Sequence, residues 1–231
     1  MPSEIRSLFI PGPAGRLEAL LNVGEADARY CALVCHPHPL YGGTMHTKVV
    51  YHAMKALNSF GFPVLRFNFR GAGLSEGKHD EGRGERDDVR AGLDWLTREY
   101  SSLPVIFAGF SFGAATGLKV CCPDERVVGL IGLGTPVAAE GRVYAYRFLA
   151  GCTKPKLFVS GMRDQYGPVE QLRSVFASAA EPKDLVLVED ADHFFEGHLP
   201  KMRDAIEDWV RREFRGANTK VTKEIIRYTE I

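Results

Sequence analysis

Residues 105–120 read VIFAGFSFGAATGLKV and join an apolar, strand-like run to a small-residue helix start through a G-x-S-x-G motif. The motif alone is a weak signal, but the strand–turn–helix context is the one in which it carries a nucleophile. Such a turn is tight and strained, so small residues must flank the serine. Its tip projects the hydroxyl above the carboxyl edge of a parallel sheet. The stretch therefore predicts Ser111 as a nucleophile.

Outward from this stretch, apolar runs alternate with helix-like segments, which favours a mostly parallel sheet with helices on both faces. The opening differs, because PGPAG separates two strand-like runs and predicts an antiparallel hairpin. We expect eight strands, near residues 5–10, 16–23, 31–35, 64–69, 105–109, 127–133, 156–160 and 185–189. Helices are expected near residues 47–60, 86–99 and 199–214, besides the one that follows Ser111.

Together the nucleophile motif and this element order predict an α/β-hydrolase fold in a single domain, residues 1–215. Only about twenty residues separate the strands at 127–133 and 156–160, which leaves room for one short helix around 141–149 and predicts a minimal cap. Residues 216–231 do not fit the scheme and form a tail of uncertain role, a candidate for homodimer formation.

A serine hydroxyl needs a general base, and the base needs a carboxylate that fixes its tautomer. His193 follows the last apolar strand and so lies at the same sheet edge as Ser111, whereas His198 falls at the start of the terminal helix. Asp164 follows the preceding strand and gives the chain order Ser, Asp, His. Asp190 and Asp192 compete for this role, but turn formation explains them better.

Acyl transfer also requires two backbone N–H groups aimed at the developing oxyanion. Phe112, the residue after the nucleophile, is the first predicted donor. The loop HPHPLYGG (36–43) supplies the other, and its prolines have no N–H to donate. His38 is the first choice and Leu40 the second.

Several apolar and aromatic residues near these positions are candidates for a substrate pocket, though many will belong to the core. The candidates are Leu40, Tyr41, Phe110, Tyr166 and Phe194. His36, His38 and His46 suggest a metal cluster, but no H-E-x-x-H pattern accompanies them, so we expect neither metal nor cofactor. His36 is better explained as a hydrogen-bonding group that shapes its loop.

Composition limits the choice of partner. Twenty-nine basic residues balance twenty-nine acidic ones, which gives no reason to expect nucleic acid or an anionic membrane as partner.

The five cysteines are odd in number and form no CxxC pair, which indicates reduced thiols and a cytoplasmic location. The first residues lack a signal-peptide pattern, and no apolar run is long enough to span a bilayer.

Five motifs in order carry a family resemblance: HPHPLYGGTMHTKVV, RFNFRGAGLSEG, GFSFGA, the aspartate of SGMRDQ, and DHFF. Together they resemble the small bacterial α/β-hydrolases sometimes called the HPHP type, which are related to dienelactone hydrolases. The resemblance covers about residues 5–213. It implies a compact hydrolase with little or no cap, a triad of Ser111, Asp164 and His193, and esterase activity on simple esters. Dienelactone hydrolases use a cysteine nucleophile, and this sequence departs from them at Ser111.

The leading hypothesis is a serine carboxylesterase that cleaves small or medium acyl esters through an acyl-enzyme. A thioesterase or a peptidase on the same fold is an enzyme alternative. A non-catalytic binding protein that retains the fold is the alternative from another class, and an intact triad argues against it.

Overall fold

The computed structural model describes residues 4–138, 142 and 144–214, which form one eight-stranded sheet in the order β1-β2-β4-β3-β5-β6-β7-β8. β1, β2 and β4 pair antiparallel, and every pair from β4 to β8 is parallel. The predicted α/β-hydrolase fold and its N-terminal hairpin are confirmed. The strands are β1 (Ile5–Gly12), β2 (Gly15–Asn22), β3 (Cys31–Cys35), β4 (Val64–Phe67), β5 (Val105–Phe110), β6 (Val127–Leu133), β7 (Lys156–Gly161) and β8 (Lys183–Val188).

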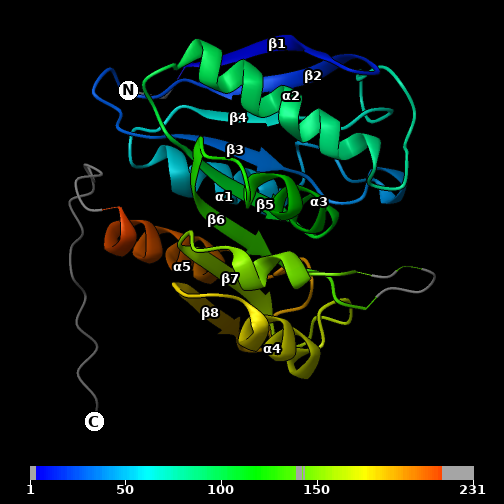
Figure 1. The fold of residues 1–231 in the computed structure, drawn as a ribbon, viewed down its shortest axis with the longest axis vertical. Helices are drawn as coiled ribbons and strands as arrows, with labels where there is room; N and C mark the ends of the chain where they lie inside the picture. Colours follow the sequence, from blue (N-terminus) through cyan, green and yellow to red (C-terminus); the bar gives the residue numbers. More distant parts are fainter. Residues whose placement is uncertain (1–3, 139–141, 143, 215–231) are drawn as a thin grey trace.

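Helices cover both faces of the sheet, as Figure 1 shows. One face carries α1 (Lys48–Asn58) and α5 (Leu199–Glu213), whose buried residues share a core with alternate residues of β3, β5 and β7. The other carries α2 (Gly84–Glu99) and α3 (Phe112–Cys121), with α4 (Val169–Ser178) packed at its edge. Because successive strand residues point to opposite faces, Leu33 joins one core, and Ala32 and Val34 join the other.

Two details of the predicted elements differ from the structure. β4 ends at Phe67 rather than at residue 69. Phe67 pairs with Cys35, the last residue of β3, so the pairing of the two strands ends there. Helix α4 had no counterpart in the prediction. Its apolar residues Val169, Leu172, Val175 and Phe176 recur at helical spacing, but the helix has only ten residues and only Leu172 is fully buried.

Between β6 and β7 the described residues form a single 3₁₀ helix, η2 (Arg147–Gly151), where a short helix around 141–149 was expected. Residues 139–141 and 143 lie outside the described residues. The predicted domain boundary at 215 and the tail 216–231 also lie outside them, so both stay predictions. None of the described helices has the length and apolar character needed to span a bilayer.

Glycines allow β5 and α3 to meet at a tight turn around Ser111. A Cβ on Gly109 would lie 2.6 Å from the Gly113 carbonyl oxygen, and a Cβ on Gly113 would lie 2.4 Å from the His36 carbonyl oxygen. Both contacts are with backbone, which cannot rotate away. The turn therefore depends on these two glycines, and Gly113 also packs α3 against the end of β3.

His36 fixes the loop that follows β3. Its fully buried ring bonds the Pro37 carbonyl through Nδ1 at 2.6 Å and the Phe69 N–H through Nε2 at 2.9 Å. The neutral ring with the proton on Nδ1 satisfies both partners, because Nδ1–H donates and Nε2 accepts. Burial lowers the pKa of His36 to about 3, so the ring is neutral near pH 7. The expected role of His36 in shaping its loop is confirmed.

We expect Gly113→Ala to lower the free energy of unfolding by about 1–3 kcal/mol, because the added methyl group overpacks against backbone. Alanine is intrinsically the better helix former by about 1 kcal/mol, so a net loss isolates the contact. Gly151→Ala is the matched control, since a Cβ there meets nothing within 4 Å. Urea titrations of both variants measure the effect, and equal midpoints would refute the packing argument.

We expect His36 to make stability fall in acid. The unfolded chain binds a proton at the ordinary pKa of 6.5, whereas the folded chain binds it only near 3. The contribution of His36 is therefore complete above pH 6.5 and declines as the pH falls toward 3, by about 1.4 kcal/mol per pH unit. Urea titrations between about pH 6 and about pH 4 give the free energy of unfolding at each pH. Its slope against pH should be shallower by that amount in His36→Gln than in wild type. An unchanged slope would contradict the assignment.

Candidate active site

Ser111 stands at the tip of the β5–α3 turn in a strained backbone conformation. Its φ is 53° and its ψ is −119°, in a region that residues with a Cβ rarely adopt. Such a conformation costs about 1–3 kcal/mol and persists only where the surrounding structure enforces it. Its N–H donates to the Leu133 carbonyl at 2.9 Å, which ties the turn to β6. The turn thus presents the hydroxyl at the carboxyl edge of the sheet.

The loop after β8 brings His193 to this hydroxyl. His193 Nε2 lies 2.9 Å from Ser111 Oγ, and its Nδ1 lies 2.8 Å from Asp164 Oδ2. A carboxylate accepts but does not donate, so Nδ1 carries the proton and Nε2 presents a lone pair to the serine hydroxyl. The ring is 3% exposed and is enclosed by aromatic rings of Phe110, Tyr166 and Phe194, with centroids 4.7–5.3 Å away. These contacts fix the orientation of the imidazole.

Asp164 follows β7 and is itself held by backbone donors. Its Oδ1 accepts the N–H groups of Tyr166 at 2.8 Å and Gly167 at 3.0 Å, and Ser160 Oγ lies 3.4 Å from Oδ2. The carboxylate is 3% exposed. Its orientation is therefore set before it meets His193.

The alternative acids and the alternative base lie elsewhere. Asp190 pairs with Arg163, and Asp192 accepts the N–H groups of Phe194 and Glu196 at 3.0 Å each, which is turn formation. His198 directly precedes α5, and its Nδ1 contacts the Glu196 carbonyl at 2.8 Å. The structure thus joins Ser111, His193 and Asp164 in one hydrogen-bonded chain and leaves these three side chains outside it.

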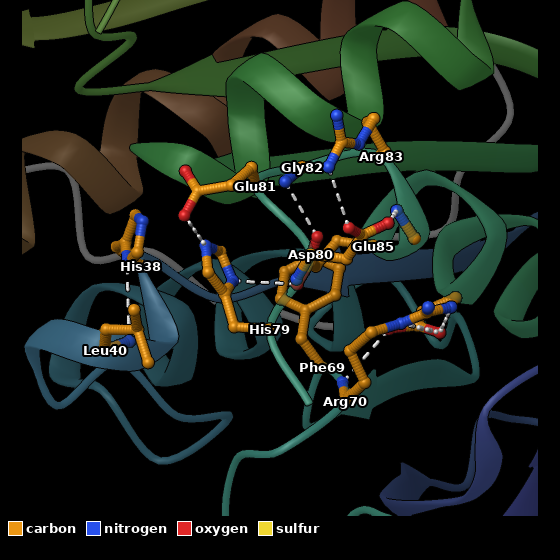
Figure 2. Close-up of polar contacts among 12 residues, drawn as sticks. His38, Leu40, Phe69, Arg70, His79, Asp80, Glu81, Gly82, Arg83 and Glu85 are labelled. Atoms are coloured by element: carbon orange, nitrogen blue, oxygen red, sulfur yellow. Dashed lines mark hydrogen bonds and ion pairs between the residues drawn. The ribbon is translucent and has the colours of Figure 1, made fainter. Parts of the chain in front are cut away.

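The oxyanion donors predicted from the sequence are the N–H group of Phe112 and that of His38 or Leu40. Phe112 opens α3, and the first N–H groups of a helix have no intrahelical acceptor. In the other loop, the Leu40 N–H donates to the ring Nδ1 of His38 at 3.2 Å, a bond drawn in Figure 2. That bond engages Leu40 and leaves the His38 N–H as the better candidate. Burial, followed by the nearby charges of Arg142 and His79, lowers the pKa of the His38 ring to about 4.

A cavity of about 370 Å³ opens above Ser111. Of the predicted pocket residues, Tyr41, Tyr166 and Phe194 line it together with His38. Leu40 is exposed and Phe110 is fully buried beneath His193, and neither is among the lining residues. Arg142 and Tyr144 also line the cavity, although no periodic pattern or motif indicated them.

The histidines of the HPHP loop do not gather with acids or thiols into a metal site. His36 is fully buried, whereas His46 is exposed. Within the described residues, no group of three or more His, Cys, Asp or Glu side chains is arranged to hold a metal ion.

Comparison with known proteins gives the family. The model of the α/β hydrolase domain family matches residues 33–211. An uncharacterised protein of Rickettsia prowazekii is 34% identical over 209 residues, which cover 88% of this chain and 87% of the relative.

Solved structures agree with this match. An α/β serine hydrolase homologue from Coxiella burnetii is 37% identical with a TM-score of 0.79, over 88% of this chain and 96% of the other. A serine hydrolase without lid from Xanthomonas campestris is 32% identical with a TM-score of 0.79, over 92% and 96% of the two chains. Its sheet topology, the family match and these relatives show that the chain belongs to the α/β hydrolase domain family.

Proposed function

We propose that the protein is a carboxylesterase that cleaves small or medium acyl esters through an acyl-enzyme. The observation that carries the proposal is the hydrogen-bonded chain from Asp164 through His193 to Ser111, at 2.8 and 2.9 Å. Both distances are within hydrogen-bond reach, as a nucleophile, its base and the group that orients the base require. The relatives named as serine hydrolases support the same reaction class.

In the proposed reaction, Ser111 Oγ attacks the ester carbonyl while His193 Nε2 takes its proton. The N–H groups of Phe112 and His38 stabilise the oxyanion of the tetrahedral intermediate. As that intermediate collapses, His193 returns the proton to the departing alkoxide and the acyl group stays on Ser111. Water then attacks the acyl-enzyme, with His193 again as base, and releases the acid. Asp164 stabilises the imidazolium throughout, and no cofactor takes part.

The aromatic lining supports an ester with an apolar part near the scissile bond. Tyr41, Tyr166 and Phe194 are all partly exposed and border the cavity above Ser111. We further propose that the chain is a serine-nucleophile member of the HPHP group related to dienelactone hydrolases. Its five cysteines are free thiols and four are buried, which supports the proposed cytoplasmic location.

We expect Ser111→Ala and His193→Ala each to lower kcat for p-nitrophenyl acetate and butyrate by about 10⁴-fold or more, since the two residues act as one unit. The double variant should lose no more than the worse single variant. Release of p-nitrophenol measures the rates, and Ser102→Ala, in an exposed turn, is the control. A well-folded wild type with no ester turnover would overturn the proposal in favour of a binding protein.

We expect Asp164→Asn to lower kcat by about 10⁴-fold, because the amide favours the wrong imidazole tautomer while keeping the shape of the carboxylate. Asp190→Asn should stay within about twofold of wild type, since Asp190 lies at an exposed ion pair. Steady-state kinetics at neutral pH compare the two. Equal losses in both variants would contradict the assignment of Asp164.

A further inference from the structure

A second cavity, of about 360 Å³, adjoins the one above Ser111. His38, Phe112, Arg142 and Tyr144 line both cavities, so a ligand can extend from one into the other past these residues. Neither Ser111 nor His193 lines the second cavity. The proposed reaction at Ser111 therefore leaves the second cavity without a role.

Three cationic side chains line the second cavity: Arg86 from α2, Lys119 from α3, and Arg142. Within residues 4–138, 142 and 144–214, none of the three forms an ion pair, whereas Arg70 and Arg126 are both paired with acids. Arg86 Nε donates to a backbone carbonyl at 2.8 Å, and its terminal nitrogens make no other hydrogen bond to the described residues.

Arg142 stands where the two cavities meet. Its Nη2 donates to the Tyr41 hydroxyl at 3.4 Å, and its guanidinium lies 5.1 Å from the centroid of the Tyr41 ring. Burial, and after it the charge of Arg142, lowers the pKa of His38, so Arg142 lies close enough to act on the ring of this residue. Among the described residues that line the second cavity, Glu81 is the one acid, and its carboxylate lies 3.9 Å from His79. Positive charge therefore exceeds negative charge around the cavity.

The wall that carries Glu81 and Gly82 is built by hydrogen bonds. Buried Glu85 accepts the N–H groups of Asp80 at 2.9 Å and Gly82 at 2.8 Å, and its Oε1 lies 2.8 Å from His79 Nδ1. Figure 2 shows this loop folded around Glu85, with His79 directed toward both glutamates. The wall is therefore largely preformed, as a binding site requires.

The position of His193 indicates which part of an ester reaches the second cavity. The leaving oxygen must face His193 Nε2, because it receives its proton there. The second cavity is lined by Phe112 and His38, the proposed oxyanion donors, but not by His193. The part of the ester that extends into it is therefore the acyl group.

Resting on the proposed function, we propose that the second cavity binds an anionic group, a carboxylate or a phosphate, at the far end of the acyl chain. Arg86, Lys119 and Arg142 contact this group, and the ester bond lies over Ser111. The preferred substrates are then esters of acids that carry a second, negatively charged group. Guanidinium and ammonium groups that lack acidic partners are the side chains that recognise such anions.

The test compares two p-nitrophenyl esters of suberic acid, one with a free terminal carboxylate and one with a terminal carboxamide. We expect wild type to prefer the carboxylate by about tenfold in kcat/KM, the size of a charged hydrogen bond. Lys119→Gln and Arg86→Gln should each reduce the ratio, and the double variant should reduce it further, leaving only the part that Arg142 supplies. The ratio corrects for any loss of folded protein, because both esters meet the same preparation.

Lys201→Gln and Arg173→Gln remove the same charges from exposed positions in α5 and α4, and both should keep the wild-type ratio. A wild type that hydrolyses both esters at equal kcat/KM overturns this proposal and leaves the esterase intact. A preference as large in the double variant as in wild type also overturns it. A wild type that hydrolyses neither ester overturns the proposed function, and the substrate class falls with it.

Discussion

The close contact of β5 and α3 at Ser111 is the constraint on which the rest of the site depends. Gly109 and Gly113 have no room for a side chain, because each faces backbone atoms at less than 3 Å. This contact, with the hydrogen bond from the Ser111 N–H to the Leu133 carbonyl, holds Ser111 at φ 53°. The other catalytic candidates are then placed by topology, since parallel strands β7 and β8 end at the same edge.

Hydrogen bonds to backbone orient each polar group of the site before substrate arrives. Asp164 is held by two N–H groups, and the ring of His36 holds the loop that carries His38. Burial keeps His36 neutral, so its two hydrogen bonds are both satisfied. A preorganised site of this kind spends little free energy on reorientation during the reaction. Three cationic side chains line the neighbouring cavity: Arg86, Lys119 and Arg142.

The sequence predicted best where a local pattern had a geometric consequence. The glycines around Ser111 predicted the tight turn that the structure shows. The choice of His38 as the second oxyanion donor stays a prediction. The prediction missed helix α4, a ten-residue segment whose apolar residues recur at helical spacing but of which only Leu172 is fully buried. The two cavities could not be predicted from the sequence for another reason. Lys119 lies on the helix that begins at Phe112, two turns along, but Arg86 and Arg142 come from distant segments, and no spacing shows that they converge.

The central claim is that Ser111 is the nucleophile, and mapping a covalent adduct tests it most directly. Native protein would be treated with a fluorophosphonate, digested with trypsin and analysed by fragmentation mass spectrometry. The tryptic peptide of residues 99–119 also contains Ser101 and Ser102, which serve as internal controls. We predict a single adduct on Ser111 that prior denaturation prevents. An adduct on another residue, or none on folded protein, would contradict the account.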